Sequence, residues 1–325
     1  MAGLSLDKIK QPISEELEIF EKKFRESMRS KTPLLDAITR YIVKSKGKQI
    51  RPMFVFLSAK LLGDINESTY RGAALVELLH TATLVHDDVV DEATERRGFF
   101  SINAIWKNKI AVLVGDYLLS KGLLLSIENK DYELLQILSK AVKEMSEGEL
   151  LQIEKTRRLD IKEEIYFEIV RQKTAVLIAS ACACGAYSTG ASDQHVEAMR
   201  LFGEKIGIAF QIKDDLLDFG NSNTGKNKGM DIQEKKLTLP VIYSLNNCPS
   251  TKRRQIIRTI KSGNKSKGAF EEVKSFINEF NGVAYATQKM NEFVEEAKFQ
   301  LNMFPDSNAK KALIDLVNFT LHREN

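Results

Sequence analysis

Two clusters of aspartates carry the clearest chemical pattern in this sequence of 325 residues. Both have the form D-D-x-x-D: Asp87, Asp88 and Asp91 make up the first, and Asp214, Asp215 and Asp218 the second. Apolar residues flank both clusters, and on a helix two side chains four positions apart lie on one face, about 5–6 Å apart. The first and last carboxylates of each cluster would repel each other unless a cation lies between them.

Magnesium is the cation that suits these ligands. Mg²⁺ takes one or two carboxylates, keeps several waters and completes its shell with phosphate oxygens of a substrate. An EF-hand is a poor alternative for residues 87–91, because that loop needs oxygens at alternating positions and a central glycine. Solvated acidic helix ends are the other alternative, but the apolar flank LLHTATLV at 78–85 favours burial. The sequence therefore predicts a magnesium site for a phosphate-bearing substrate.

Several basic residues are placed to bind that phosphate. Lys48 and Arg51 lie beside a helix that Pro52 can open, and a helix N-terminus with cations close by binds anions. Arg96-Arg97 follow the first aspartate cluster and can chelate a diphosphate, the alternative being a solvated charge pair. Lys173 lies in a mostly apolar run, where an unpaired ammonium is costly and a bound diphosphate would satisfy it.

The distribution of charge supports separate phosphate-binding and metal-binding regions. The net charge is only +4, which gives no reason to expect a nucleic-acid partner. Residues 37–63 hold basic side chains and no acidic one, whereas residues 72–95 hold acidic side chains and no lysine or arginine. His80 lies in the second region, seven positions before Asp87, so that both face nearly the same way; a buried core histidine is the alternative.

The sequence shows no pattern typical of an exported protein or of a membrane-spanning segment. The three cysteines include no Cys-x-x-Cys pair, which argues against a disulfide framework or a zinc site, and Cys182 and Cys184 are expected to be small buried residues. The N-terminus lacks a signal-peptide core. The longest apolar stretch, 174–187, is shorter than the roughly 20 residues that span a bilayer. We therefore expect a cytoplasmic protein without a transmembrane segment.

The periodicity of apolar residues predicts an all-α fold. The chain has only 18 glycines and 6 prolines, so few segments are broken. Helices are expected to start at Pro33, Pro52 and Asn66, the last running past Asp91 towards Gly98. Further helices are expected over 108–127, 131–156, 162–188, 193–219, 234–246, 251–262, 269–300 and 308–322. No linker divides the chain, so residues 1–325 are predicted to form one domain, with 220–236 as a mobile loop and possible lid over anions.

With these motifs in order, the sequence resembles the trans-isoprenyl diphosphate synthases of the polyprenyl type. The resemblance is carried by GKQIRP, LLHTATLVHDDVVDEATERRG, GDYLLS, RQKTA, FQIKDDLLD and GMDIQEKKLTLP. It spans nearly the whole chain and points to the medium- or long-chain type, such as the octaprenyl diphosphate synthases. It implies the isoprenoid synthase fold, a bundle of long helices around a deep cavity, as a homodimer. The chain departs from the family's usual residues at Lys46, Gln49, Phe99-Phe100 and Lys235.

The resemblance also implies a reaction and a role for each motif. An allylic diphosphate ionises, the double bond of isopentenyl diphosphate attacks the cation, and loss of a proton leaves a chain one isoprene unit longer. The six aspartates would hold about three Mg²⁺ ions, with Asp87, Asp214 and Lys173 as the catalytic residues. Isopentenyl diphosphate would be bound by Lys48, Arg51, His80 and Arg97. The allylic diphosphate would be bound by Arg96, Lys173, Thr174, Gln211 and Lys228.

Residues preceding the first aspartate cluster bear on product length. One helical turn is about 5.4 Å, roughly one isoprene unit, and the small Ala82 and Thr83 lie one turn before Asp87. In short-chain members of the family bulky aromatics near this position block the tail, and none occurs between Ala73 and His86. Leu79 and Val76, two and three turns away, are of moderate size. The expected product has about six to eight isoprene units, for a quinone side chain or similar lipid, with possible peripheral membrane contact for its release.

Other functions remain open at this point. One is a short-chain farnesyl or geranylgeranyl diphosphate synthase. A class I terpene cyclase also uses an aspartate-rich helix and Mg²⁺, but it needs no isopentenyl site and would leave Lys48 and Arg51 unexplained. A regulatory synthase subunit is a third, although such subunits tend to lose one aspartate motif. A helical scaffold without a ligand is the fourth.

Overall fold

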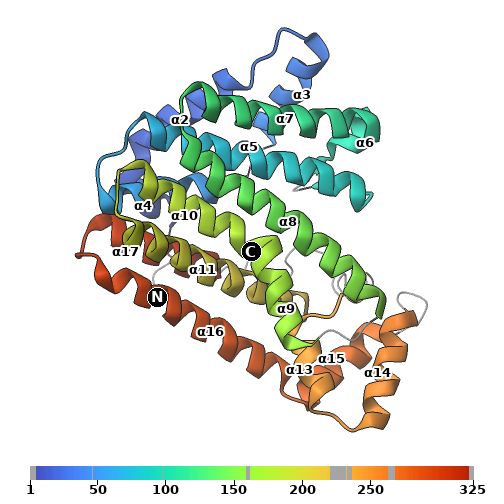
Figure 1. Cartoon of the computed structure of the whole chain (residues 1–325). Coiled ribbons are helices and arrows are strands. Elements are labelled where there is room, and N and C mark those ends of the chain that lie inside the picture. The colour runs from blue at the N-terminus through green and yellow to red at the C-terminus, as the bar shows by residue number, and fades with distance from the viewer. Residues whose placement is uncertain are drawn as a thin grey trace. The chain divides into compact units, whose positions relative to one another are not determined.

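The computed structural model describes residues 5–45, 47–96, 98–158, 162–219, 232, 236–262 and 268–321. These residues are helical almost throughout (Figure 1), which confirms the predicted all-α fold. Arg97 and Lys228, and nearly all of the predicted lid, lie outside the described residues. The chain separates into two compact units: unit 1 holds Met1–Val142, Leu177–Arg200 and Phe304–Leu313, and unit 2 holds Lys143–Val176, Leu201–Met303 and Ile314–Asn325. A single domain over 1–325 stays a prediction.

Unit 1 begins with a series of helices joined by short turns. They are α1 (Leu6–Lys10), η1 (Gln11–Ile13), α2 (Ser14–Ser27), α3 (Pro33–Lys44), α4 (Ile50–Leu62), α5 (Glu67–Val90), α6 (Ile102–Trp106) and α7 (Asn108–Glu128). It also holds α10 (Val176–Ser188) from Leu177 on, while α8 (Tyr132–Arg158), α11 (Asp193–Phe219) and α17 (Asn308–Leu321) contribute residues to both units.

The helix that carries the first aspartate cluster is α5. It begins at a capping box, in which the Asn66 side chain accepts from the backbone N–H of Thr69 and the Thr69 hydroxyl accepts from the backbone N–H of Asn66. The expected continuation towards Gly98 is wrong. The helix ends at Val90 because Glu92 adopts a left-handed backbone, with φ of 52°. The chain then forms a two-residue antiparallel pair, β1 (Glu95–Arg96) with β2 (Phe99–Phe100).

Small residues allow α4, α5 and α10 to pack closely in the core of unit 1. A Cβ on Gly185 of α10 would lie 2.2 Å from the backbone oxygen of Val55 in α4. A Cβ on Gly72 of α5 would be in ordinary contact with Cys184, 3.7 Å away. Cys182 and Cys184 are fully buried, as predicted. The helix that carries both cysteines, α10, is therefore a core helix.

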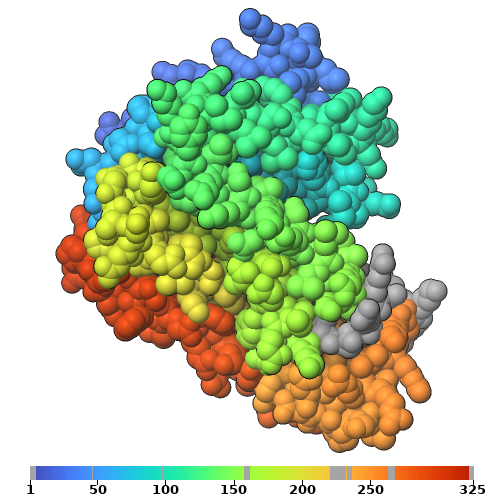
Figure 2. Space-filling view, viewed as in Figure 1, coloured from blue at the N-terminus to red at the C-terminus, as the bar shows by residue number. Residues whose placement is uncertain are grey.

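Figure 1 shows α5 and α7 running side by side. A Cβ on Gly115 of α7 would meet the His86 ring at 2.1 Å, and one on Gly122 would meet Leu75 at 2.8 Å, so both glycines admit α5 side chains. The opposite face of α7 forms part of the surface (green in Figure 2) and exposes Val112, Leu113, Leu123, Leu124 and Ile127.

The length of α7 bears on the expectation that no segment crosses a membrane. Although charged residues interrupt it, α7 is long and apolar enough to cross a membrane by length and composition, and 33% of its most apolar 18 residues are buried. Core helices of soluble proteins meet the same criterion, so this is weak evidence for a membrane span.

Unit 2 contains the remaining helices. They are α9 (Glu163–Val170), the π-helix η2 (Arg171–Ala175), α13 (Leu239–Asn246), α14 (Ser250–Ser262), α15 (Ala269–Glu279), α16 (Gly282–Gln300) and η4 (Leu301–Met303). Of the helix expected over 234–246, the described part begins at Leu239, after Thr238 in extended backbone. The single helix expected over 269–300 is broken, because Asn281 is left-handed (φ 56°) and Gly282 lies against the backbone oxygen of Pro240.

Candidate active site

The first aspartate cluster lies at the C-terminal end of α5 in unit 1. The Asp88 side chain is buried, and Nε and Nη2 of Arg96 each lie 2.8 Å from its Oδ1 atom. Burial raises the pKa of the Asp88 carboxyl, and the Arg96 guanidinium opposes that rise. Asn103 donates to the backbone oxygens of Asp88 and Ala93, at 3.0 and 3.1 Å, and so holds the turn that follows the helix. Arg96 is thereby fixed beside the cluster.

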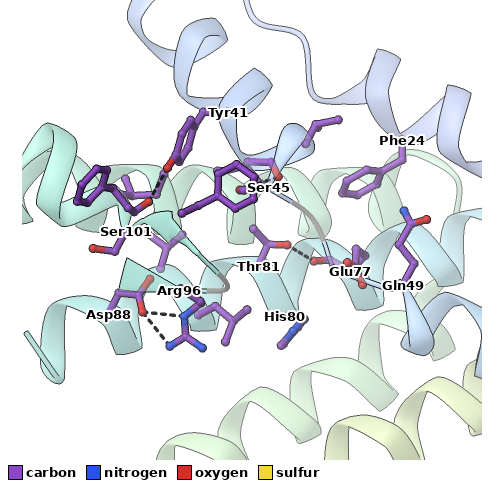
Figure 3. A pocket seen from close by; sticks show the side chains of 18 residues that line it. Phe24, Tyr41, Ser45, Gln49, Glu77, His80, Thr81, Asp88, Arg96 and Ser101 are labelled. Atoms are coloured by element: carbon purple, nitrogen blue, oxygen red, sulfur yellow. Dashed lines mark hydrogen bonds and ion pairs between the residues drawn. The ribbon is translucent and has the colours of Figure 1, made fainter. Parts of the chain in front are cut away.

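A pocket in unit 1 brings three predicted site residues together (Figure 3). His80 and Asp88 of α5 line it with Arg96 of β1, and Gly47 and Gln49 line it from the segment before α4. Its other wall is aromatic and consists of Phe24, Tyr41, Phe99 and Phe100. The cavity measures about 90 Å³, well below the roughly 300–1,000 Å³ of typical ligand pockets. By itself it would not enclose a whole substrate.

Tyr41 anchors the β1–β2 pair to α3. Its hydroxyl donates to the backbone oxygen of Phe100 at 2.7 Å, and its ring makes edge contacts with Phe99 and Trp106. Phe99 is the strand partner of Arg96, so the contacts of Tyr41 with β2 also hold the strand that carries Arg96. Sequence reasoning did not identify Tyr41, because its partner lies 59 positions away.

The other predicted residues of unit 1 lie outside that pocket lining. Lys48 stands between the lining residues Gly47 and Gln49, and Arg51 is in the first turn of α4. Of the residues predicted to set product length, Val76, Leu79 and Ala82 are buried, and Thr83 donates to the backbone oxygen of His80 at 2.9 Å.

Unit 2 places Lys173 and Thr174 in the π-helix η2. A π-helical turn is rare and occurs frequently at functional sites. Two glycines make room for it: a Cβ on Gly207 of α11 would lie 2.4 Å from the Cα atom of Ala175, and one on Gly148 of α8 would lie 2.7 Å from Gln172. The segment predicted as plain helix is therefore clamped between α8 and α11.

Arg171, the first residue of η2, is anchored to both neighbouring helices. It forms ion pairs with Glu144 of α8 at 2.7 Å and with Glu168 of α9 at 2.9 Å. The hydrogen bond from Arg171 lowers the pKa of Glu168. These charges fix the start of the π-helix.

One hydrogen-bond network joins the π-helix to the second aspartate cluster. The Thr174 hydroxyl donates to Oε1 of Gln211 at 2.9 Å, and Nε2 of Gln211 donates to Oδ1 of Asp215 at 3.2 Å. The other oxygen of Asp215 accepts from the Tyr166 hydroxyl at 2.7 Å and from the backbone N–H of Leu239 at 3.2 Å. The buried carboxylate of Asp215 is thus oriented by three segments of unit 2.

The environment of Lys173 differs from the expectation. Its ammonium forms an ion pair with Glu149 of α8, and the side chain is about one-third exposed, at 32%. The sequence pattern did not reveal the approach of α8, which supplies this carboxylate. Binding of a diphosphate by Lys173 stays a prediction.

Carboxylates suited to a metal are present as pairs. In the part of the chain that the structure describes, no three histidine, cysteine, aspartate or glutamate side chains are grouped as a complete metal cage. Mg²⁺ needs only one or two carboxylates when waters and phosphate complete its shell, so the first and last aspartates of each cluster fit this ion. The middle ones, Asp88 and Asp215, are buried and accept hydrogen bonds from Arg96 and Tyr166.

Comparison with known proteins identifies the family. The Polyprenyl synthetase family model matches residues 32–277. The chain is 35% identical to an all-trans-nonaprenyl-diphosphate synthase of Rhodobacter capsulatus, over 96% of each chain. It is 32% identical to the octaprenyl diphosphate synthase of Escherichia coli, over 99% of this chain and 100% of that one. A short chain isoprenyl diphosphate synthase of Methanothermobacter thermautotrophicus is also 35% identical, over 94% and 96% of the chains.

Solved structures agree with this relationship. A decaprenyl diphosphate synthase from Rhodobacter capsulatus superposes with a TM-score of 0.93 at 34% identity, covering 98% of this chain and 99% of that one. A polyprenyl synthase from Caulobacter crescentus, crystallised with calcium and isoprenyl diphosphate, gives a TM-score of 0.90 at 31% identity, covering 99% and 98%. The chain therefore belongs to the polyprenyl synthetase family and has the isoprenoid synthase fold, as predicted. It is a trans-prenyltransferase.

Proposed function

We propose that this prenyltransferase condenses isopentenyl diphosphate with an allylic diphosphate, in a Mg²⁺-dependent reaction, to make an all-trans polyprenyl diphosphate. The observation that carries the proposal is the network from Thr174 through Gln211 to Asp215. It joins the residues expected at the allylic diphosphate to the second aspartate cluster within one unit. The calcium and isoprenyl diphosphate named with the Caulobacter crescentus enzyme support the same ligand chemistry.

The aspartates would divide into two roles. Asp87 with Asp91, and Asp214 with Asp218, would hold Mg²⁺, while Asp88 and Asp215 orient their clusters through Arg96 and Tyr166. Bound Mg²⁺ would supply Lewis-acid stabilisation of the charge on the departing diphosphate. Around it, Arg96, Lys173, Thr174, Gln211 and Lys228 would hold the allylic diphosphate. Lys48, Arg51, His80 and Arg97 would hold isopentenyl diphosphate.

The product would be of medium or long chain, about six to eight isoprene units by the helical-turn argument. Ala82 and Thr83 leave space one turn before Asp87, and long-chain synthases are among the matched relatives. Overall identity does not decide the length, because the short-chain relative is as similar as the nonaprenyl one. Side chains along α5 are therefore the basis of this part of the proposal.

Isotope-labelled isopentenyl diphosphate provides the test of the reaction. With Mg²⁺ and farnesyl diphosphate, label should enter a longer prenyl diphosphate, and EDTA should abolish the incorporation. Consumption of farnesyl diphosphate alone, without isopentenyl diphosphate, would instead support a terpene cyclase. Failure of the isolated, folded chain to incorporate label would support a regulatory subunit.

The enzyme would work as a cytoplasmic homodimer that assembles through α7. The exposed leucines of α7, such as Leu113 and Leu124, form an apolar face of the kind that marks interaction sites. Light scattering should give twice the chain mass, and Leu113→Glu with Leu124→Glu should give monomers. The matched control Leu150→Glu, at an exposed leucine of α8, should leave the mass unchanged. A monomeric wild-type protein would contradict this assembly.

A further inference from the structure

The helix α14 has an unusual charge composition. It contains five basic residues and no acidic one, and the sequence from Lys235 to Phe270 includes nine lysines and arginines without a single aspartate or glutamate. The chain as a whole is nearly balanced, with 48 basic and 44 acidic residues, so this segment departs from the average. A run of like charges is ordinarily a solvated surface. The contacts of each basic side chain show which of them are used within the protein and which are exposed.

One side of α14 packs into unit 2. Ile256 and Ile260 are fully buried there. Two basic residues near this side have protein partners: Lys252 lies 3.7 Å from Glu279 of α15, and Arg253 donates to the backbone oxygen of Leu245 at 3.3 Å. These contacts hold α14 against its neighbours in unit 2, and they give two of its five basic side chains a partner within the protein.

A second side of α14 faces α15 through neutral groups. Gln255 donates to Oε1 of Glu272 at 2.6 Å, and the Thr259 hydroxyl donates to Oε2 of the same residue at 2.9 Å. Both oxygens of this carboxylate are therefore bound by an amide and a hydroxyl. The carboxylate does not form an ion pair with the remaining cations of α14.

The third side, the cationic face of α14, consists of Arg254, Arg258 and Lys261. These residues are exposed and follow the spacing i, i+4 and i+7, so they form one stripe along the helix. Among the described residues, no carboxylate pairs with any of the three. Figure 1 shows α14 beside α15 at the edge of unit 2, and its orange side chains contribute to the surface in Figure 2.

We propose that the cationic face of α14 docks the enzyme on an anionic phospholipid bilayer. The choice of a bilayer rests on the proposed function, since a diphosphate with a long prenyl tail is poorly soluble in water and must pass to a lipid phase. The apolar side of α14 is packed in the protein, so the contact is electrostatic. Nucleic acid fits less well, because α14 has no aromatic side chain for base stacking.

Co-sedimentation of the full-length protein with lipid vesicles tests the proposal in the absence of substrate. Vesicles of phosphatidylcholine containing about one-third phosphatidylglycerol should bind the protein at low salt, and pure phosphatidylcholine should not. Raising the salt from about 0.05 M to about 0.5 M should release it, because exposed charges are screened. The triple variant Arg254→Glu, Arg258→Glu, Lys261→Glu should bind on the order of a hundredfold more weakly.

A matched charge change elsewhere provides the control. Lys8→Glu, Lys140→Glu, Lys311→Glu alters three exposed lysines by the same charge and should retain most of the vesicle binding. Equal binding by wild type and the α14 triple variant, or equal loss by the control, would overturn the proposal, as would wild-type binding to an oligonucleotide but not to vesicles. Prenyl transfer measured in detergent should be unchanged in the triple variant, so loss of docking is distinguishable from failure of the proposed reaction.

Discussion

Thr174 of the π-helix donates a 2.9 Å hydrogen bond to Gln211 of α11, and Gln211 in turn donates to Asp215. Thr174 and Gln211 are 37 positions apart in the sequence, and this hydrogen bond holds their side chains together. The sequence alone does not predict that Thr174 is linked to the second aspartate cluster through Gln211. Thr174 lies inside the π-helical turn, which packs against α11 at Gly207.

Removing this hydrogen bond should weaken binding of the allylic substrate. In Thr174→Val the side-chain oxygen of Gln211 loses its donor, and a lost bond of this kind costs about 1 kcal/mol, or roughly a fivefold to tenfold rise in KM for the allylic diphosphate. Thr174→Ser should restore wild-type values. The control Thr287→Val removes a hydroxyl that donates to the backbone oxygen of Val283 in its own helix, and it should leave KM unchanged. An unchanged KM in Thr174→Val would show that the bond does not organise the site.

The close approach of Gly207 to Ala175 predicts a steric effect. A Cβ at Gly207 would lie 2.4 Å from a backbone atom, which cannot move without displacing the π-helix. Gly207→Ala should therefore lower stability by about 1–3 kcal/mol and lower activity. Gly72→Ala is the matched control, since its Cβ would meet neighbours at 3.6 and 3.7 Å and alanine favours a helix. Thermal unfolding of both variants measures the difference, and equal melting temperatures would contradict the clamp.

The orientation of Asp215 by Tyr166 makes a separate prediction. Tyr166→Phe removes the 2.7 Å donor from a buried carboxylate and should cost about 1–3 kcal/mol of stability. We also expect the Mg²⁺ concentration for half-maximal activity to rise severalfold, because the second cluster is less well oriented. Tyr132→Phe, at a tyrosine that is 59% exposed, should change neither quantity. A Mg²⁺ dependence identical to wild type would exclude this positioning role.

The buried position of Ala82 makes product length testable. Ala82→Phe should shorten the product, because the ring would occupy space one turn before Asp87. Ala73→Phe is the control: Ala73 is equally buried on α5 but nine positions away, on the opposite side of the helix. If phenylalanine unfolds either variant by overpacking, leucine replaces it. Products of unchanged length from a folded Ala82→Phe enzyme would show that the tail takes another path.

Thiol reactivity provides a direct check of the core. Cys182 and Cys184 are fully buried, and burial raises the pKa of Cys182 to about 12 and that of Cys184 further. At pH 8 both therefore remain protonated and inaccessible, whereas Cys248 is only partly buried. Native protein should react with one equivalent of a thiol reagent, and unfolded protein with three. Rapid labelling of three thiols in the native state would contradict the placement of α10.

Periodicity and capping residues were sufficient to predict most of the helices. Asn66 and Thr69 form a local capping box, and the apolar spacing in α10 already indicates a buried helix. The helix α2 was not predicted, although Leu17, Phe20 and Phe24 recur at helical spacing. Apolar spacing and capping residues predicted a helix wherever the interactions that form it lie within a few residues of one another.

Tertiary contacts account for what the sequence did not reveal. The π-helix depends on two distant glycines, Gly148 and Gly207, and the β1–β2 pair depends on Tyr41. Glu149, which pairs with Lys173, and Tyr166, which binds Asp215, lie on segments that the sequence places far from their partners. The aspartate clusters were recognisable because their chemistry is contained in five consecutive residues, whereas the groups that orient them were not.

Product chromatography tests the central claim most directly. The purified chain, incubated with Mg²⁺, farnesyl diphosphate and labelled isopentenyl diphosphate, should yield all-trans diphosphates of about six to eight isoprene units, and none in the presence of EDTA. Products that stop at three or four units would contradict the length argument drawn from α5. Absence of any labelled prenyl product from the folded protein would contradict the proposed reaction itself.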